Sequence, residues 1–184
     1  LISIVALWQT NRQIKLSNKQ QLFDRRLGNY LIIEGLISLY QKNRYNSNGN
    51  GEQNKYPFFT IDVTFNALTN NSYLEDVYAA IIPPFDNPVR KIFLTKLEEL
   101  HRIETECELI FSEDISAHLC GFVSKYRDLL NAIYSYAIIL DKAKNQTVLT
   151  DNGEAKFPET LGLFREPKYR EKIIEAHREL ETLY

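Results

Sequence analysis

Few side chains in this sequence could act as metal ligands or acid–base groups. The histidines His101, His118 and His177 lack a spacing such as His-x3-His with a further ligand, so each is interpreted as an ordinary helix residue. Residues 98–114 hold seven carboxylates against one Arg, and Glu104 and Glu108 share a helix face within that run. The paired Glu-x-x-His motifs of di-iron bundles are absent. We therefore expect a solvated acidic helix face and predict no metal, no cofactor and no catalytic residue.

Arg170 and His177 give the chain its one nuclease-like pattern. Six residues separate them, so at about 100° per residue they lie about 20° from a common helix face. The spacing resembles the Arg-x(4–6)-His element of the HEPN family of helical RNases. That resemblance implies an Arg and a His that act on phosphate and the 2′-OH, normally across a dimer. Glu171, Glu175 and Glu179 share the helix and would repel RNA phosphate, so the HEPN-like RNase is the alternative hypothesis, and nucleic acid is disfavoured as a partner.

The two cysteines, Cys107 and Cys120, fall within helical patterns. In a reducing compartment they are expected to stay reduced, as small buried apolar residues, although a disulfide between them remains open. The sequence contains no Gly-rich phosphate loop and no Gly-x-Ser-x-Gly nucleophile elbow. These patterns favour a non-enzymatic domain.

The composition and the spacing of apolar residues predict an all-α bundle of about four to six helices with a long N-terminal stem helix. The chain has 184 residues, with only seven Gly and six Pro, too few for a turn-rich β architecture. Apolar residues recur every three or four positions, most regularly over residues 113–144. The later predicted helices cover residues 57–68, 72–82 (with Ser72 and Glu75 as a capping box), 87–110, 113–144 and 167–184, with a single turn at 158–164.

The core of this bundle is predicted from the same spacing. Its expected members are Phe93, Leu97, Leu100, Ile103, Cys107 and Ile110, then Ile115, Leu119, Phe122, Tyr126, Leu129, Ile133, Ala137 and Leu140, then Ile173, Ile174, His177 and Leu180. From the first helix we expect Phe23, Leu27, Tyr30, Leu31 and Ile37 to join them.

The first helix, residues 1–43, is predicted to organise the whole chain. Residues 1–8 are uncharged and mostly apolar, and residues 9–21 are polar and basic. We interpret residues 1–21 as the end of a membrane anchor followed by a basic stem. Residues 22–184 are interpreted as a single helical domain with a flexible Asn-rich loop at 43–55.

A membrane-surface site is predicted on the stem, at Trp8, Arg12, Lys15, Lys19, Arg25 and Arg26. Tryptophan is enriched at membrane interfaces, and basic residues that follow an apolar segment mark its cytoplasmic side. Residues 1–55 carry eight Lys/Arg and three Asp/Glu, or +5, and residues 56–184 carry fourteen and twenty-one, or −7. This split favours anionic lipid as the partner of the N-terminal end. The competing interpretation is an ordinary buried or frayed helix start, because eight residues cannot span a bilayer that needs about 20.

The stem sequence Leu22-Phe23-Asp24-Arg25-Arg26-Leu27, with a Tyr three residues on, resembles a loosely defined group of small bacterial membrane-anchored helical proteins of unknown function. Their stems carry LFDRRLxxY-like motifs, and their later helices carry a Phe followed by acidic residues, as at residues 110–115 here. The resemblance implies a helical fold, a membrane tether and a context in bacterial defence, and it implies no catalytic residue.

Three functional hypotheses follow. The first is a membrane-associated domain on the cytoplasmic face that acts as a protein-interaction or sensor module, through a protein partner or as a homo-oligomer. The second is the HEPN-like RNase with Arg170 and His177. The third is a bundle that binds a lipid or small ligand in an interior rich in Tyr and Phe, of which the chain has eleven and ten.

Overall fold

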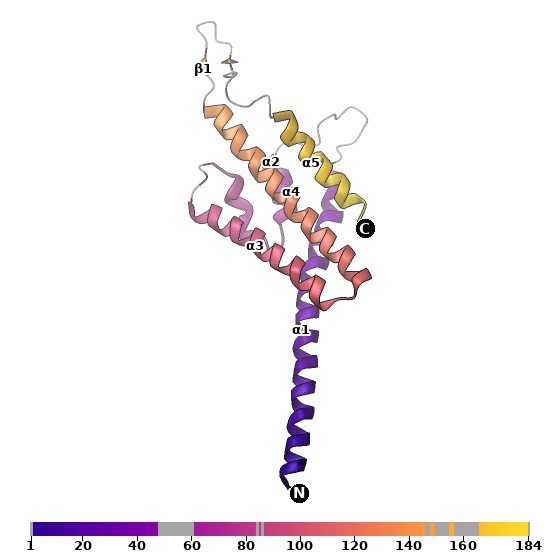
Figure 1. Cartoon of the computed structure of the whole chain (residues 1–184). Helices are drawn as coiled ribbons and strands as arrows, with labels where there is room; N and C mark the ends of the chain where they lie inside the picture. The colour runs from indigo at the N-terminus through magenta and orange to yellow at the C-terminus, as the bar shows by residue number, and fades with distance from the viewer. Residues whose placement is uncertain are drawn as a thin grey trace.

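Figure 1 shows the computed structural model, which describes residues 2–47, 61–83, 85, 87–145, 148–149, 155–156 and 166–183. Its elements are α1 (Ile2–Ser47), α2 (Ile61–Thr69), the 3-10 helix η1 (Glu75–Ile81), α3 (Asn87–Ile110), α4 (Glu113–Asn145) and α5 (Glu166–Glu181). Two short strands, β1 (Val148–Leu149) and β2 (Ala155–Lys156), pair antiparallel between α4 and α5. The predicted all-α bundle with a long N-terminal helix is confirmed.

Helix α4 is the central helix of the bundle, because it contacts α1, α2, η1, α3 and α5. Its apolar residues alternate by three and four along one seam. Phe122, Tyr126, Leu129 and Ile133 are all buried, while Ile115, at the start of the helix, is exposed. α3 packs on α4 as the other arm of an antiparallel hairpin, and α5 packs along α4 as well (Figure 1). The predicted inward positions of α3 and α5 are also confirmed at Phe93, Leu100, Ile103 and Cys107 and at Ile173 and Leu180, all of them buried.

The face that α1 buries differs from the predicted one. Asn29, Ile33, Leu36 and Tyr40 are its buried residues. Phe23, Leu27, Tyr30 and Leu31, predicted to join the core, are 43–62% exposed, and only Ile37 of that set packs against the core. The helix carries apolar residues on two faces here, and the sequence pattern alone does not decide which of them meets the bundle.

Polar contacts fix α1 onto the rest of the bundle at three levels. Near the bottom of the bundle, the Arg26 side chain donates to the carbonyl oxygen of Ile110, the last residue of α3. One turn further on, Asn29 donates to Glu106 at 3.0 Å. In the interior, the hydroxyl of Tyr40 lies 3.1 Å from Nδ1 of His177 in α5. The basic Arg26 is well placed at the negative end of the α3 dipole.

Two local predictions on the α1–η1 stretch were wrong. The loop predicted at 43–55 begins later, because α1 continues to Ser47, and Asn43 donates both to Leu39 O at 2.9 Å and to Ala67 O at 3.0 Å. The capping box at Ser72 does not form. Instead Oδ1 of Asn71 accepts from the backbone N–H groups of Tyr73 and Leu74, both at 2.9 Å, and the segment winds as a 3-10 helix from Glu75.

Three predicted segments lie outside the described residues. They are most of the Asn-rich loop (48–55), the start of the helix predicted from residue 57, and the turn at 158–164. Where α2 is described, it runs from Ile61 to Thr69, one residue past the predicted end.

Candidate functional surface

The stem of α1 is the most distinctive surface of the described chain. Every described side chain from Ala6 to Gly28 is exposed, and the helix projects from the bundle as a single rod (Figure 1). The first hydrogen bond from the stem to the bundle is made by Arg26, and burial begins at Asn29. At 1.5 Å per residue, the 18 steps from Trp8 to Arg26 make this rod about 27 Å long.

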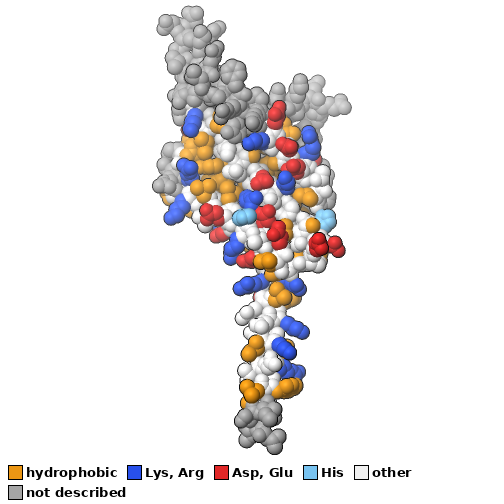
Figure 2. All heavy atoms as spheres, in the orientation of Figure 1, with side chains coloured by type: hydrophobic (Ala, Val, Ile, Leu, Met, Phe, Trp, Pro, Cys, Tyr) orange, Lys and Arg blue, Asp and Glu red, His pale blue; other side chains and the backbone are white. Residues whose placement is uncertain are grey.

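The predicted membrane-surface residues are brought onto one side of the stem, apart from Arg25. At 100° per residue, Trp8, Arg12, Lys15, Lys19 and Arg26 fall within a stripe about 60° wide. We call these five residues the basic stripe. Figure 2 shows blue side chains gathered along the stem below the bundle, whereas red ones gather on the bundle itself.

Within the basic stripe, Trp8 and Arg12 contact each other. The Arg12 guanidinium carbon lies 5.7 Å from the centre of the Trp8 ring, which is cation–π geometry, and Trp8 is 63% exposed. An aromatic ring with a basic group beside it is suited to the headgroup region of a bilayer, where an apolar body and a charged tip are both satisfied. Arg25 lies on another side of the helix, and Arg26 is bound to the end of α3. These two neighbouring arginines therefore do not form one common binding surface.

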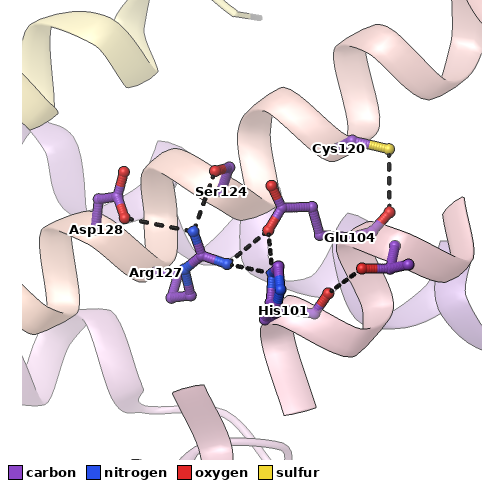
Figure 3. Close-up of polar contacts among 7 residues, drawn as sticks. His101, Glu104, Cys120, Ser124, Arg127 and Asp128 are labelled. Carbon is purple, nitrogen blue, oxygen red and sulfur yellow. Dashed lines mark hydrogen bonds and ion pairs between the residues drawn. The ribbon is translucent and has the colours of Figure 1, made fainter. Parts of the chain in front are cut away.

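The acidic run of α3 is largely paired within the molecule. In Figure 3, Arg127 of α4 donates to Glu104 at 2.6 Å, and His101 lies 3.1 Å from the same carboxylate. Burial alone raises the pKa of Glu104, but hydrogen bonds from His101 and Ser124 and the charge of Arg127 outweigh it and hold the pKa below its usual value.

Two more carboxylates of this run are paired within α3 itself. Glu99 pairs with Lys96 at 2.9 Å, and Glu106 lies 3.6 Å from Arg102. A groove of about 370 Å³ between α3 and α4 is lined by Glu104, Glu108, Glu113 and Cys120, among others. No group of three or more His, Cys, Asp or Glu among the described residues could hold a metal ion. Two carboxylates of the acidic face join α3 to its neighbours: Glu104 accepts from Arg127 of α4, and Glu106 accepts from Asn29 of α1.

Of the nuclease-like pair, only His177 has a described side chain, and it packs against α1. His177 packs against Tyr40, with ring centres 5.8 Å apart, and burial lowers its pKa to about 4. The side chain of Arg170 lies outside the described residues. His101 and His118 are exposed on α3 and α4.

The cysteines are free and buried. Burial, with Cys120 nearby, raises the pKa of Cys107 to about 12, so this thiol stays protonated and unreactive at neutral pH. The interior aromatic rings pack against one another: Tyr40, Phe122 and Tyr126 form three edge or tilted contacts at 5.7–6.5 Å. These contacts give the aromatic residues a packing role in the core.

Sequence reasoning missed one feature of the stem, an exposed apolar strip formed by Leu16, Phe23, Leu27, Tyr30 and Leu31. The signal was present in the sequence, but Phe23, Leu27, Tyr30 and Leu31 were expected in the core, and Leu16 fell within the segment interpreted as a polar stem. Among the described helices, none is long and apolar enough to cross a bilayer. Comparison with family models, curated proteins and solved structures gives no match.

Proposed function

We propose that the protein is a membrane-associated interaction module on the cytoplasmic face, whose stem binds an anionic lipid surface and carries the bundle away from it. The observation that carries this proposal is the basic stripe on a fully exposed helix, with Trp8 at its far end. Each basic side chain near an anionic surface contributes about 1 kcal/mol. In a stem that leans toward this side, Arg12, Lys15 and Lys19 come near the surface together with Trp8, because they point the same way, and the bundle still stays away from it.

Alternative uses of this surface have less support. A nucleic-acid partner would have to meet a bundle whose residues 56–184 carry a net −7, from fourteen Lys/Arg and twenty-one Asp/Glu. For the HEPN-like alternative, a general acid–base His works best with a pKa near neutrality and access to substrate, whereas His177 is packed against Tyr40. The membrane surface remains the better match to the stem.

The test uses Trp8, the one tryptophan of the chain, as its reporter. Vesicles of phosphatidylcholine with phosphatidylserine are expected to shift Trp8 emission to the blue, and vesicles of phosphatidylcholine alone are not. The double variant Arg12→Glu/Lys15→Glu should weaken binding by at least about thirtyfold, as expected for two contributions of about 1 kcal/mol each.

The matched control is Arg90→Glu/Lys91→Glu, which makes the same charge change at exposed positions of α3. It should bind as the unmodified chain does. Equal binding to neutral and anionic vesicles, or equal loss in both double variants, would contradict a lipid site on the stem.

A further inference from the structure

The exposed apolar residues of α1 lie on a regular seam that no described part of the bundle covers. Its positions alternate by three and four along the helix: Gln13, Leu16, Gln20, Phe23, Leu27 and Tyr30, here called the outer seam. Leu16, Phe23, Leu27 and Tyr30 are 58, 62, 43 and 48% exposed. At 100° per residue the seam centres about 140° from the buried residues Asn29, Ile33, Leu36 and Tyr40, so the bundle does not obstruct it.

Alternation by three and four is the heptad spacing of a coiled coil, with Gln13, Gln20 and Leu27 at a positions and Leu16, Phe23 and Tyr30 at d positions. We propose that a second copy of this chain occupies the outer seam, so that two α1 helices form a short parallel coiled coil. This rests on the interaction role proposed above, but it does not require the membrane.

The charges at the positions beside the outer seam favour a second copy of the chain in parallel orientation. The g positions beside the seam are Arg12, Lys19 and Arg26, and Asp24, the one acid among the first 33 residues, is at an e position. In a parallel dimer each g residue faces the e residue five positions later in the other helix. Lys19 of each copy therefore meets Asp24 of the other.

An antiparallel pair would instead set g positions against g positions. Arg12, Lys19 and Arg26 would then face basic residues, and Asp24 would have no basic partner at the seam. Within one helix, residues five apart do not face each other, so Lys19 and Asp24 do not form an ion pair within a single chain.

The outer seam has defined ends. The next a position after Leu27 is Glu34, which is exposed, and two facing carboxylates would stop the pairing there. The seam thus covers 18 residues, or about 27 Å, most of it along the stem. Glutamines at a positions weaken such a coiled coil but favour one register, since each can pair with its counterpart. Parallel pairing also directs both N-terminal ends the same way.

A charge-swap series tests the pairing, with the mass of the 184-residue chain measured in solution by sedimentation equilibrium without vesicles. Lys19→Glu and Asp24→Lys should each raise the dimer dissociation constant by about three- to tenfold, because each places like charges across the seam twice. The double variant Lys19→Glu/Asp24→Lys restores opposite charges and should restore dimerisation. Phe23→Asp should leave a monomer with unchanged helical circular dichroism, because Phe23 is outside the core.

Cysteine cross-linking tests the orientation. Gln13→Cys should give a disulfide-linked dimer on mild oxidation, since residue 13 meets itself only in a parallel pair, whereas in an antiparallel pair it faces the region of residue 30. Asn18→Cys, exposed at a position pointing away from the seam, is the control and should not cross-link.

Three outcomes would overturn the proposal: a monomer at every concentration up to about 1 mM, no rescue in the double variant, or equal cross-linking at residues 13 and 18. None of them bears on lipid binding, which the vesicle titration with Arg12→Glu/Lys15→Glu decides separately. A chain that dimerises without binding vesicles would keep this inference and remove the tether.

Discussion

At the residue scale, His177 shows how a candidate catalytic group serves the fold instead. Its ring stacks on Tyr40 at an interplanar angle of 24°. The Tyr40 hydroxyl donates to the carbonyl oxygen of His177 at 3.1 Å, which leaves the hydroxyl oxygen to accept from Nδ1 at 3.1 Å. Because burial lowers the pKa of His177 to about 4, the ring is neutral at neutral pH. The pair joins α1 to α5.

This burial makes the stability of the protein depend on pH. An unfolded His titrates near 6.5 and the folded His177 near 4, so protons bind the unfolded state first as the pH falls. The contribution of His177 to stability should therefore be constant above about pH 6.5 and decrease between pH 6.5 and 4, by at most about 3 kcal/mol. Urea unfolding across this range should show that decrease, and His177→Gln should flatten it. His118→Gln, at an exposed position, should not; an identical pH slope in all three chains would count against the assignment.

Two buried tyrosines of α4 provide a second comparison of single groups. The hydroxyl of Tyr126 donates to the carbonyl oxygen of Leu68 in α2, whereas the buried hydroxyl of Tyr134 has no hydrogen-bond partner among the described residues. Tyr126→Phe leaves a buried carbonyl unpaired and should cost about 1–3 kcal/mol in the free energy of unfolding. Tyr134→Phe should be neutral or stabilising. Denaturant unfolding measures both, and equal costs would show that the Tyr126 contact is not specific.

At the element scale, periodicity predicted α3, α4 and α5 well, because each has one apolar face. α4 carries one apolar seam, formed by Phe122, Tyr126, Leu129 and Ile133, and no second apolar seam on the opposite side. All four residues are buried. α1 has two such faces, one through Ile33 and Leu36 and the other through Phe23 and Leu27. Spacing identifies which residues share a face, but the choice between two faces is made by α3 and α4, whose positions are tertiary information.

For the candidate site too, the sequence predicts which residues share a helix face but not which neighbouring helix they meet. Trp8 and the basic residues of the stem were predicted from their order along the chain. Placing Arg12, Lys15 and Lys19 on one stripe follows from the continuous helix, but the contact of Arg26 with Ile110 depends on where α3 ends in space. Similarly, the sequence did not show that Asn71 would replace Ser72 at this turn, where its side chain accepts from the backbone N–H groups of Tyr73 and Leu74.

The bundle is expected to fold without the stem. Deleting residues 1–21 removes only exposed side chains among those described and leaves the contacts of Arg26 and Asn29 in place. The free energy of unfolding should change by no more than about 0.5 kcal/mol. Leu36→Ala in the full chain is the comparison and should lose about 2–5 kcal/mol, because Leu36 is buried in the core. Denaturant unfolding would contradict this boundary if the deletion cost as much as the core substitution.

At the scale of the whole molecule, charge and shape agree in separating the stem from the bundle. Residues 1–28 carry +4, from five basic residues and one acidic residue, and residues 29–184 carry −6, from seventeen and twenty-three. The stem is a thin rod, and the bundle is a broad body at its far end (Figure 1). An anionic surface would attract the first and repel the second, so the same field that binds the protein also orients it.

This orientation predicts how the protein stands on a membrane. On a supported bilayer containing phosphatidylserine, Trp8 should lie at the interface and the bundle should begin at Arg26, at most about 27 Å further out, and closer in proportion as the stem leans. Neutron reflectometry should then resolve a thin layer of low protein density next to the headgroups and a dense layer beyond it. The bundle variant Arg90→Glu/Lys91→Glu should keep this profile, because it leaves the stem unchanged and makes the body more acidic. A dense layer directly on the headgroups would mean that the stem lies flat and that the charge of the bundle does not orient the protein.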